Sequence, residues 1–230
     1  MNINFPSGSG SSTVGITAAS PRRLSRLVTV TGAVGVGYTL SWIAGLAVSA
    51  PSPAFGASGQ QLITALAGHG TAQAVQYALT EGLPAAGIAV VSVGLARALA
   101  KTHTVASRVA MAAGLMAALI SLTQFCLGMV LARTTAASAP STVHLLFETV
   151  NRLDGVKMLA LAVLGCAAAV AASLPRWLRY LGAALGVTIA ASGVVFLLLL
   201  QGLMVLAGPA LVVLLAFITG AGIWLGGRDR

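Results

Sequence analysis

Acidic residues are almost absent from this chain of 230 residues, which has four Asp and Glu against thirteen Lys and Arg. Charged residues make up only 7% of the sequence, while hydrophobic residues make up 57%. A soluble domain carries roughly 25% charged residues, so this chain has too few charges to cover a water-exposed surface. In a bilayer, outward-facing side chains are apolar and helices satisfy their own backbone. The composition therefore excludes an ordinary soluble domain and predicts an all-α integral membrane protein.

Motifs for cofactors, metals and nucleic acids are also missing. The sequence has no phosphate-binding Gly-Lys loop, no HExxH and no Ser-His-Asp order. Cys126 and Cys166 lie inside apolar runs, where thiols behave as small apolar residues. His144 and Glu148, four residues apart, would offer two metal ligands without the rest of a cluster. We predict no cofactor and no metal site, and, without a basic patch interleaved with aromatics, no nucleic-acid partner.

Long hydrophobic runs are what the sequence has in abundance. At about 1.5 Å per residue, a run of some 20 residues crosses a ~30 Å hydrocarbon core. We predict six transmembrane helices at about residues 27–50, 77–100, 109–132, 154–173, 181–200 and 207–226. The uncharged Ser/Gly-rich residues 1–20 are predicted to be a disordered tail, and residues 21–230 one transmembrane domain. The boundary between the last two spans is the least marked.

The distribution of basic residues predicts the orientation of these spans. Cytoplasmic loops carry an excess of Lys and Arg. Three basic residues (Arg133, Arg152 and Lys157) fall on the predicted outer side, and the other ten fall on the inner side. These ten are Arg22, Arg23, Arg26, Arg97, Lys101, Arg108, Arg176, Arg179, Arg228 and Arg230. The pattern predicts a multi-pass protein of the bacterial cytoplasmic membrane, with both termini in the cytoplasm.

Two details of the amino-terminal third leave alternatives open. Arg22-Arg23, before an apolar segment that ends in Ala47-Val48-Ser49-Ala50, resembles a cleavable export signal. Pro51 directly after that segment, and the length of the apolar run, favour a retained first span instead. In the loop that follows, Gln61 to Ala74 mixes apolar and polar residues and predicts a short interfacial helix.

Small residues recur at four-residue spacing in most of the spans. Helices in a bilayer pair through small residues because these allow close backbone approach. The stripes are Gly37, Ser41 and Gly45; Ala110, Gly114 and Ala118; Gly165, Ala169 and Ser173; Gly182, Gly186 and Ala190; and Gly222 and Gly226. They predict a compact bundle surrounded by lipid; a face for a second copy or for other membrane subunits is the alternative.

Charged residues gather where the fourth predicted span begins. Glu148 with Arg152, and Asp154 with Lys157, are spaced to pair along one helix. At about 100° per residue the two pairs point to nearly opposite faces. We expect Asp154 and Lys157 to face the bundle, and Glu148 and Arg152 to lie at the headgroup boundary. The alternative is that both pairs only anchor the start of the helix.

Glu81 is the sharpest candidate for a functional side chain. It lies one turn into the second predicted span, three residues before Pro84. Proline removes a helix hydrogen bond and can kink the helix. A carboxylate beside such a kink could carry a proton or bind a cation; it could equally pair with Arg152 or Lys157 and lock two helices together.

The block Phe147-Glu148-Thr149-Val150-Asn151-Arg152-Leu153-Asp154-Gly155-Val156-Lys157-Met158-Leu159-Ala160-Leu161 resembles a helix start in uncharacterised multi-spanning membrane proteins of actinobacteria. The resemblance covers this block and the six-span layout, and it implies no activity. We therefore hold three hypotheses. The first is a non-enzymatic accessory, assembly or signalling subunit. The second is a small transporter or transporter subunit that uses Glu81 and the Asp154/Lys157 pair. The third is a membrane enzyme that acts on lipid at the outer face through Glu81, His144 or Glu148.

Overall fold

The computed structural model describes residues 21–48, 50–134 and 138–228, and within these ranges the chain is helical, without β-strands. The predicted disordered tail, residues 1–20, lies outside the described residues. The helices are α1 (Pro21–Ala47), α2 (Gly59–Leu66), α3 (Gly70–Tyr77), η1 (Ala78–Gly82), α4 (Leu83–Leu99), α5 (Thr104–Thr134), α6 (Pro140–Ala169), α7 (Arg176–Leu197), η2 (Gln201–Leu206) and α8 (Ala207–Gly227). The all-α prediction is confirmed.

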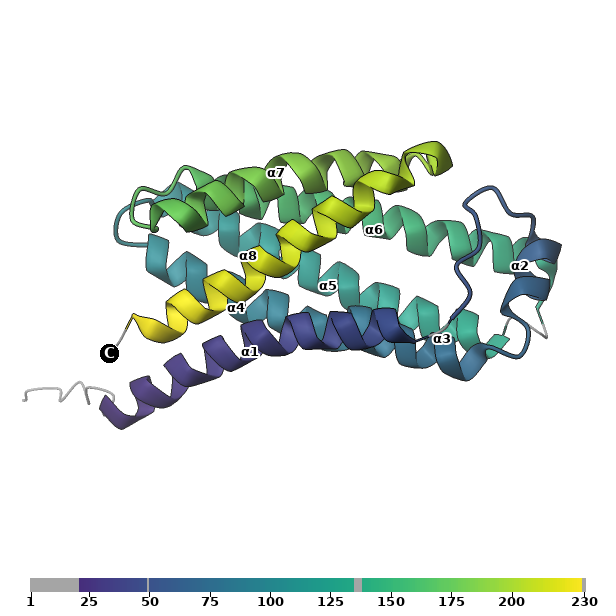
Figure 1. Cartoon of the computed structure of the whole chain (residues 1–230), viewed down its shortest axis with the longest axis horizontal. Coiled ribbons are helices and arrows are strands. Elements are labelled where there is room, and N and C mark those ends of the chain that lie inside the picture. Colours follow the sequence, from purple (N-terminus) through teal and green to yellow (C-terminus); the bar gives the residue numbers. More distant parts are fainter. Residues whose placement is uncertain (1–20, 49, 135–137, 229–230) are drawn as a thin grey trace, which may run out of the picture.

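The long helices run side by side along the longest axis of the molecule (Figure 1). One end, which we call the basic end, holds the α4–α5 and α6–α7 connections and the end of α8. The opposite end, which we call the cap end, holds α2, α3 and η2. A small apolar cluster there, which includes Phe55, Leu62 and Phe147, packs α2 against the beginning of α6.

Five helical segments of the described chain are long and apolar enough to cross a membrane. They are Val30–Ala47, Gly70–Leu99, Thr104–Arg133, Arg176–Leu197 and Gln201–Gly227. The remaining long helix, α6, carries four charged side chains along its 30 residues, namely Glu148, Arg152, Asp154 and Lys157. The all-helical bundle and these five segments fit a multi-pass membrane protein.

The beginning of the second span differs from the prediction. The single interfacial helix expected over Gln61–Ala74 is wrong, because the chain forms two helices there, α2 and α3. A capping box fixes the start of α2: the Gln61 amide donates to Ser58 Oγ, and the Ser58 amide donates to Gln61 Oε1. Gly68, with φ of +77°, follows the end of α2 in a conformation that favours glycine. α3 then continues through η1 into α4, so this segment begins at Gly70 and not near Tyr77.

The helix that contains most of the fourth predicted span begins earlier than that span. The expected range was 154–173, but α6 begins at Pro140 and ends at Ala169. Pro140 stands at the first helical position, where a missing amide is tolerated. Asp154 consequently lies almost four turns inside α6, and the alternative in which Asp154 and Lys157 only anchor a helix start is wrong. Apart from the beginning of the second span, the other predicted spans agree with their helices to within about six residues.

Close packing at glycines holds the bundle together, as the small-residue stripes of α6 and α7 predict. A Cβ added to Gly165 would lie 2.7 Å from the Gly182 carbonyl oxygen, and one on Gly155 would lie 2.7 Å from the Gly193 oxygen. α1 and α8 meet in the same way where Gly35 faces Gly222. The first predicted stripe is only partly used, because a Cβ on Gly37 would meet nothing within 4 Å.

Candidate functional site

A single π-helical turn, η1, carries Glu81 into the bundle. Within it the Leu83 amide donates to the Ala78 carbonyl, one residue farther back than in an α-helix. In this register the next donor to the Leu79 carbonyl would be Pro84, which has no N–H. Ser41 of α1 supplies the missing donor, its hydroxyl lying 2.5 Å from the Leu79 oxygen. The proline that marked Glu81 in the sequence therefore coincides with a distorted turn that a neighbouring helix stabilises.

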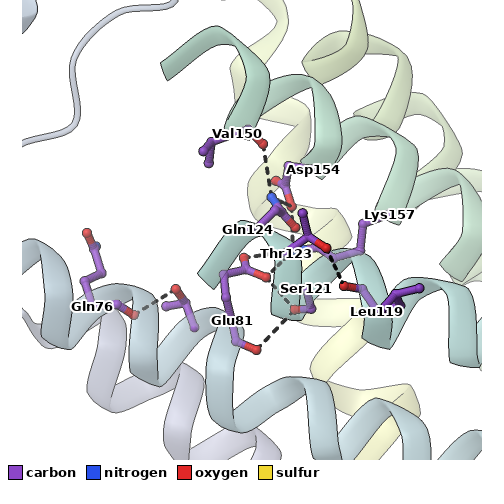
Figure 2. A network of polar contacts seen from close by, with 10 residues as sticks. Gln76, Glu81, Leu119, Ser121, Thr123, Gln124, Val150, Asp154 and Lys157 are labelled. Atoms are coloured by element: carbon purple, nitrogen blue, oxygen red, sulfur yellow. Dashed lines mark hydrogen bonds and ion pairs between the residues drawn. The ribbon is translucent and has the colours of Figure 1, made fainter. Parts of the chain in front are cut away.

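Glu81 forms an ion pair with Lys157 in the interior of the bundle (Figure 2). Lys157 Nζ donates to Glu81 Oε1 at 2.8 Å and to Oε2 at 2.7 Å. The same ammonium lies 2.6 Å from Asp154 Oδ1, one turn back along α6. Glu81 and Lys157 are only 6% and 4% exposed. Of the two basic partners considered for Glu81, the structure provides Lys157 and not Arg152, and the pair joins η1 to α6.

Two polar side chains of α5 complete this group. Ser121 Oγ donates to Glu81 Oε2 at 2.5 Å. Gln124 Nε2 donates to the Val150 carbonyl at 3.1 Å and to Asp154 Oδ1 at 3.4 Å. Ser121 and Gln124 are three residues apart and so share one face of α5. We call Glu81, Ser121, Gln124, Asp154 and Lys157 the buried cluster; it links η1, α5 and α6 (Figure 2).

The buried cluster carries an uneven formal charge. Its two carboxylates and one ammonium leave one negative charge when all three groups are ionised. Tyr38 of α1 and Tyr77 of α3 lie near enough to interact electrostatically with both carboxylates, but a neutral phenol adds no balancing charge. Burial of an uncompensated charge in an apolar medium costs several kcal/mol. The arrangement therefore favours the binding of one proton or one monovalent cation.

Asp154 is the member of the buried cluster that faces open space. Its side chain is 18% exposed, against 5% for Lys157 and 8% for Glu81. Asp154 and Lys157 line a cavity of about 140 Å³ between α1, α6, α7 and α8. Both contacts of the Asp154 carboxylate described above use Oδ1.

The second predicted pair lies elsewhere, on the surface of α6. Glu148 Oε2 is 3.6 Å from Arg152, whose side chain is 55% exposed. Glu148 Oε1 is 3.6 Å from His144 Nε2, and His144 Nδ1 contacts the Ala57 carbonyl. The structure thus brings Glu81, Asp154 and Lys157 together and keeps Glu148 and Arg152 outside the cluster. Among the described residues, no group of three His, Cys, Asp or Glu could hold a metal ion.

Two side chains at the site, Ser121 and Trp42, are not among the residues predicted from the sequence. Ser121 had a detectable signal, because it precedes Gln124 by three residues in an otherwise apolar run. Trp42 of α1 had none; it lines the cavity beside Asp154.

Comparison with known proteins gives no relative whose residue roles could be carried over to this chain. No family model, no curated protein and no solved structure matches the chain.

Proposed function

We propose that this chain is a six-span protein of the bacterial cytoplasmic membrane, with both termini in the cytoplasm, and that it is a small transporter or transporter subunit. In it, Asp154 binds one proton against the fixed Lys157–Glu81 pair. The observation that carries the proposal is the uneven charge of the buried cluster: two carboxylates share one ammonium at 2.6–2.8 Å.

The arrangement of the helices supports the topology. If α6 crosses the membrane with the five apolar segments, the basic end holds nine of the ten basic residues predicted to be cytoplasmic, by their positions along the chain. The tenth, Arg230, lies outside the described residues. Arg133 and Arg152 fall toward the cap end, and Lys157 is neutralised inside the bundle. This distribution is the one that the positive-inside rule describes.

Cysteine labelling tests the topology. In a background with Cys126 and Cys166 replaced by Ala, Thr64→Cys on α2 and Thr102→Cys after α4 both present exposed positions. A membrane-impermeant maleimide added to intact cells with an accessible cytoplasmic membrane is expected to label Thr64→Cys. It should reach Thr102→Cys only after the membrane is opened. Labelling of both positions in intact cells would refute the six-span topology.

The proton is assigned to Asp154 because the other two charged groups already have close partners. Lys157 donates two hydrogen bonds to Glu81, and its ammonium lies 2.6 Å from Asp154 Oδ1. Glu81 receives Lys157 on both oxygens and Ser121 on one of them. Of the two carboxylates, Asp154 is the one that lines the cavity and is the more exposed, so a proton can reach it without breaking the Lys157–Glu81 pair. Ionisable groups in membrane spans commonly serve as such relays.

Infrared spectroscopy can test the bound proton directly, because the chain has only four Asp and Glu side chains. At pH 7 an exposed carboxyl group is ionised. Purified protein in nanodiscs is expected to show the C=O stretching band of one protonated carboxylic acid. Asp154→Asn should remove this band and Glu148→Gln should leave it unchanged. A wild-type spectrum without the band would refute the proposal.

A non-enzymatic accessory or assembly subunit is the second candidate. The Lys157 ammonium finds its partners within the chain, with both oxygens of Glu81 and one of Asp154 within 2.8 Å, and this favours such a role because the contact needs no ligand. In that case the buried cluster only locks η1 and α5 to α6. The same infrared measurement separates the two candidates. A cluster that only holds the helices together needs no exchangeable proton, so a carboxylic acid band that does not change with pH would favour the accessory subunit.

A further inference from the structure

The cavity beside Asp154 lies where α1 and α8 separate. The two helices pack closely at Gly35 and Gly222, and the Thr39 and Thr219 hydroxyls lie 2.6 Å apart. Toward the cap end, α8 turns away from α1 and approaches α7 (Figure 1). The cavity occupies this separation, with Trp42 of α1 on one side and Leu211 of α8 on another. A ligand there contacts α1 and α8, which otherwise meet only along their close-packed half.

The walls of the cavity are apolar except at one place. Met158, Leu161, Ile189, Phe196 and Leu214 contribute hydrophobic surface. Asp154 and Lys157 are the charged lining residues, and the Lys157 ammonium is already held between Glu81 and Asp154. The chemically available group is therefore the Asp154 carboxylate, beside an aromatic wall at Trp42.

The charge of the buried cluster selects the charge of the ligand. A group with a single positive charge would neutralise the remaining negative charge, whereas an anion would add to it. A charge-assisted hydrogen bond to the Asp154 carboxylate would hold such a cation. The indole of Trp42 favours a cation as well, because aromatic faces attract ammonium groups.

The lining also argues against a bare metal ion. Hard cations need about six oxygen ligands. Asp154 is the only lining residue with a side-chain oxygen, and the backbone carbonyls of the lining helices are engaged within those helices. The volume of about 140 Å³ equals four to five water molecules at ~30 Å³ each, which suits a small organic body.

We propose that this cavity binds a small organic ammonium ion with an apolar body of about four carbons, and that the ion displaces the proton from Asp154. This inference rests on the proposed function and names its substrate class. The exchange is balanced: the N–H of the ammonium replaces the O–H of the carboxylic acid at Asp154, and one proton leaves for each cation bound. Exchange of this kind would couple amine movement to proton movement in the opposite direction.

Isothermal titration calorimetry with n-butylammonium chloride tests the proposal on the purified full-length protein in nanodiscs. Butylammonium is expected to bind, whereas 1-butanol, which has the same body without the charge, and ammonium chloride, which lacks the body, are not. Repeating the titration in buffers of different ionisation enthalpy should show about one proton released per ligand. Binding should weaken as the pH falls, because protons then compete for the carboxylate.

Three substitutions locate the site. Asp154→Asn should weaken butylammonium binding roughly tenfold or more, because it removes the charge on the acceptor. Trp42→Leu should weaken it several-fold, and Glu148→Gln on the surface of α6 should leave it unchanged. If Asp154→Asn does not fold, two measurements on the wild-type protein test the proposal instead: the pH dependence of butylammonium binding and the number of protons released on binding.

The outcomes also separate the two proposals. An infrared band from a protonated Asp154 without butylammonium binding would overturn the substrate class and leave the proton site intact. The substrate class would also be overturned if 1-butanol bound as tightly as butylammonium, or if Asp154→Asn bound butylammonium as tightly as the wild-type protein does. The cavity would then be only an apolar space. Loss of the infrared band itself would overturn the proposed function.

Discussion

Replacement of Lys157 with Met is expected to destabilise the folded protein by about 3–5 kcal/mol, because it leaves the buried carboxylates without a partner. Lys157 is 4% exposed and has three carboxylate oxygens within 2.8 Å. Methionine fills a similar volume, so lost packing contributes little. Unfolding in mixed micelles of increasing SDS fraction, followed by circular dichroism, measures the change.

Arg152→Met is the matched control, since Arg152 lies on the same helix and pairs with Glu148 at the surface. An exposed pair contributes at most about 1 kcal/mol, so this variant should remain close to wild type. Adding Glu81→Gln and Asp154→Asn to Lys157→Met should restore part of the stability, because no uncompensated charge then remains. Equal stability of Lys157→Met and Arg152→Met would mean that the buried cluster does not hold η1, α5 and α6 together.

Replacement of Gly165 with Val is expected to separate α6 from α7 and to cost about 1–3 kcal/mol or more. A Cβ at this position would lie 2.7 Å from the Gly182 carbonyl oxygen and 3.0 Å from the Gly186 amide nitrogen. Both atoms are backbone, so no side chain can rotate away and one helix must shift. The SDS titration described for Lys157 applies here, together with the monodisperse yield in gel filtration.

Gly37→Val provides the comparison, because a Cβ on Gly37 meets nothing within 4 Å. Gly37 belongs to an equally regular small-residue stripe, so the two variants separate sequence pattern from actual packing. We expect Gly37→Val to stay within roughly 0.5 kcal/mol of wild type, as surface substitutions usually do. A similar loss of stability in both variants would show that the loss follows from replacing a glycine of a small-residue stripe, and not from the α6–α7 contact.

Most of the helices were predictable because the bilayer imposes a simple rule. A helix must stay apolar for about 20 residues, and its charged ends mark the two sides of the membrane. α5, α7 and α8 follow that rule and lie near their predicted ranges. α6 departs from it, because Lys157, in the interior of the helix, is neutralised by Glu81 on another helical segment. The hydropathy pattern could not reveal that partner.

By itself, the sequence determined an all-helical chain with the composition of a membrane protein, and it marked Glu81, Asp154 and Lys157 as candidate functional residues. Composition, periodicity and local spacing are properties of the chain alone, and they are enough for those conclusions. Only the tertiary structure decided that Glu81 pairs with Lys157, that Ser121 and Gln124 join them, and that Asp154 faces a cavity beside Trp42. These contacts join residues that are 30 to 112 positions apart in the chain. They depend on how each helix is rotated about its axis, which is fixed by packing against its neighbours and not by its own residues.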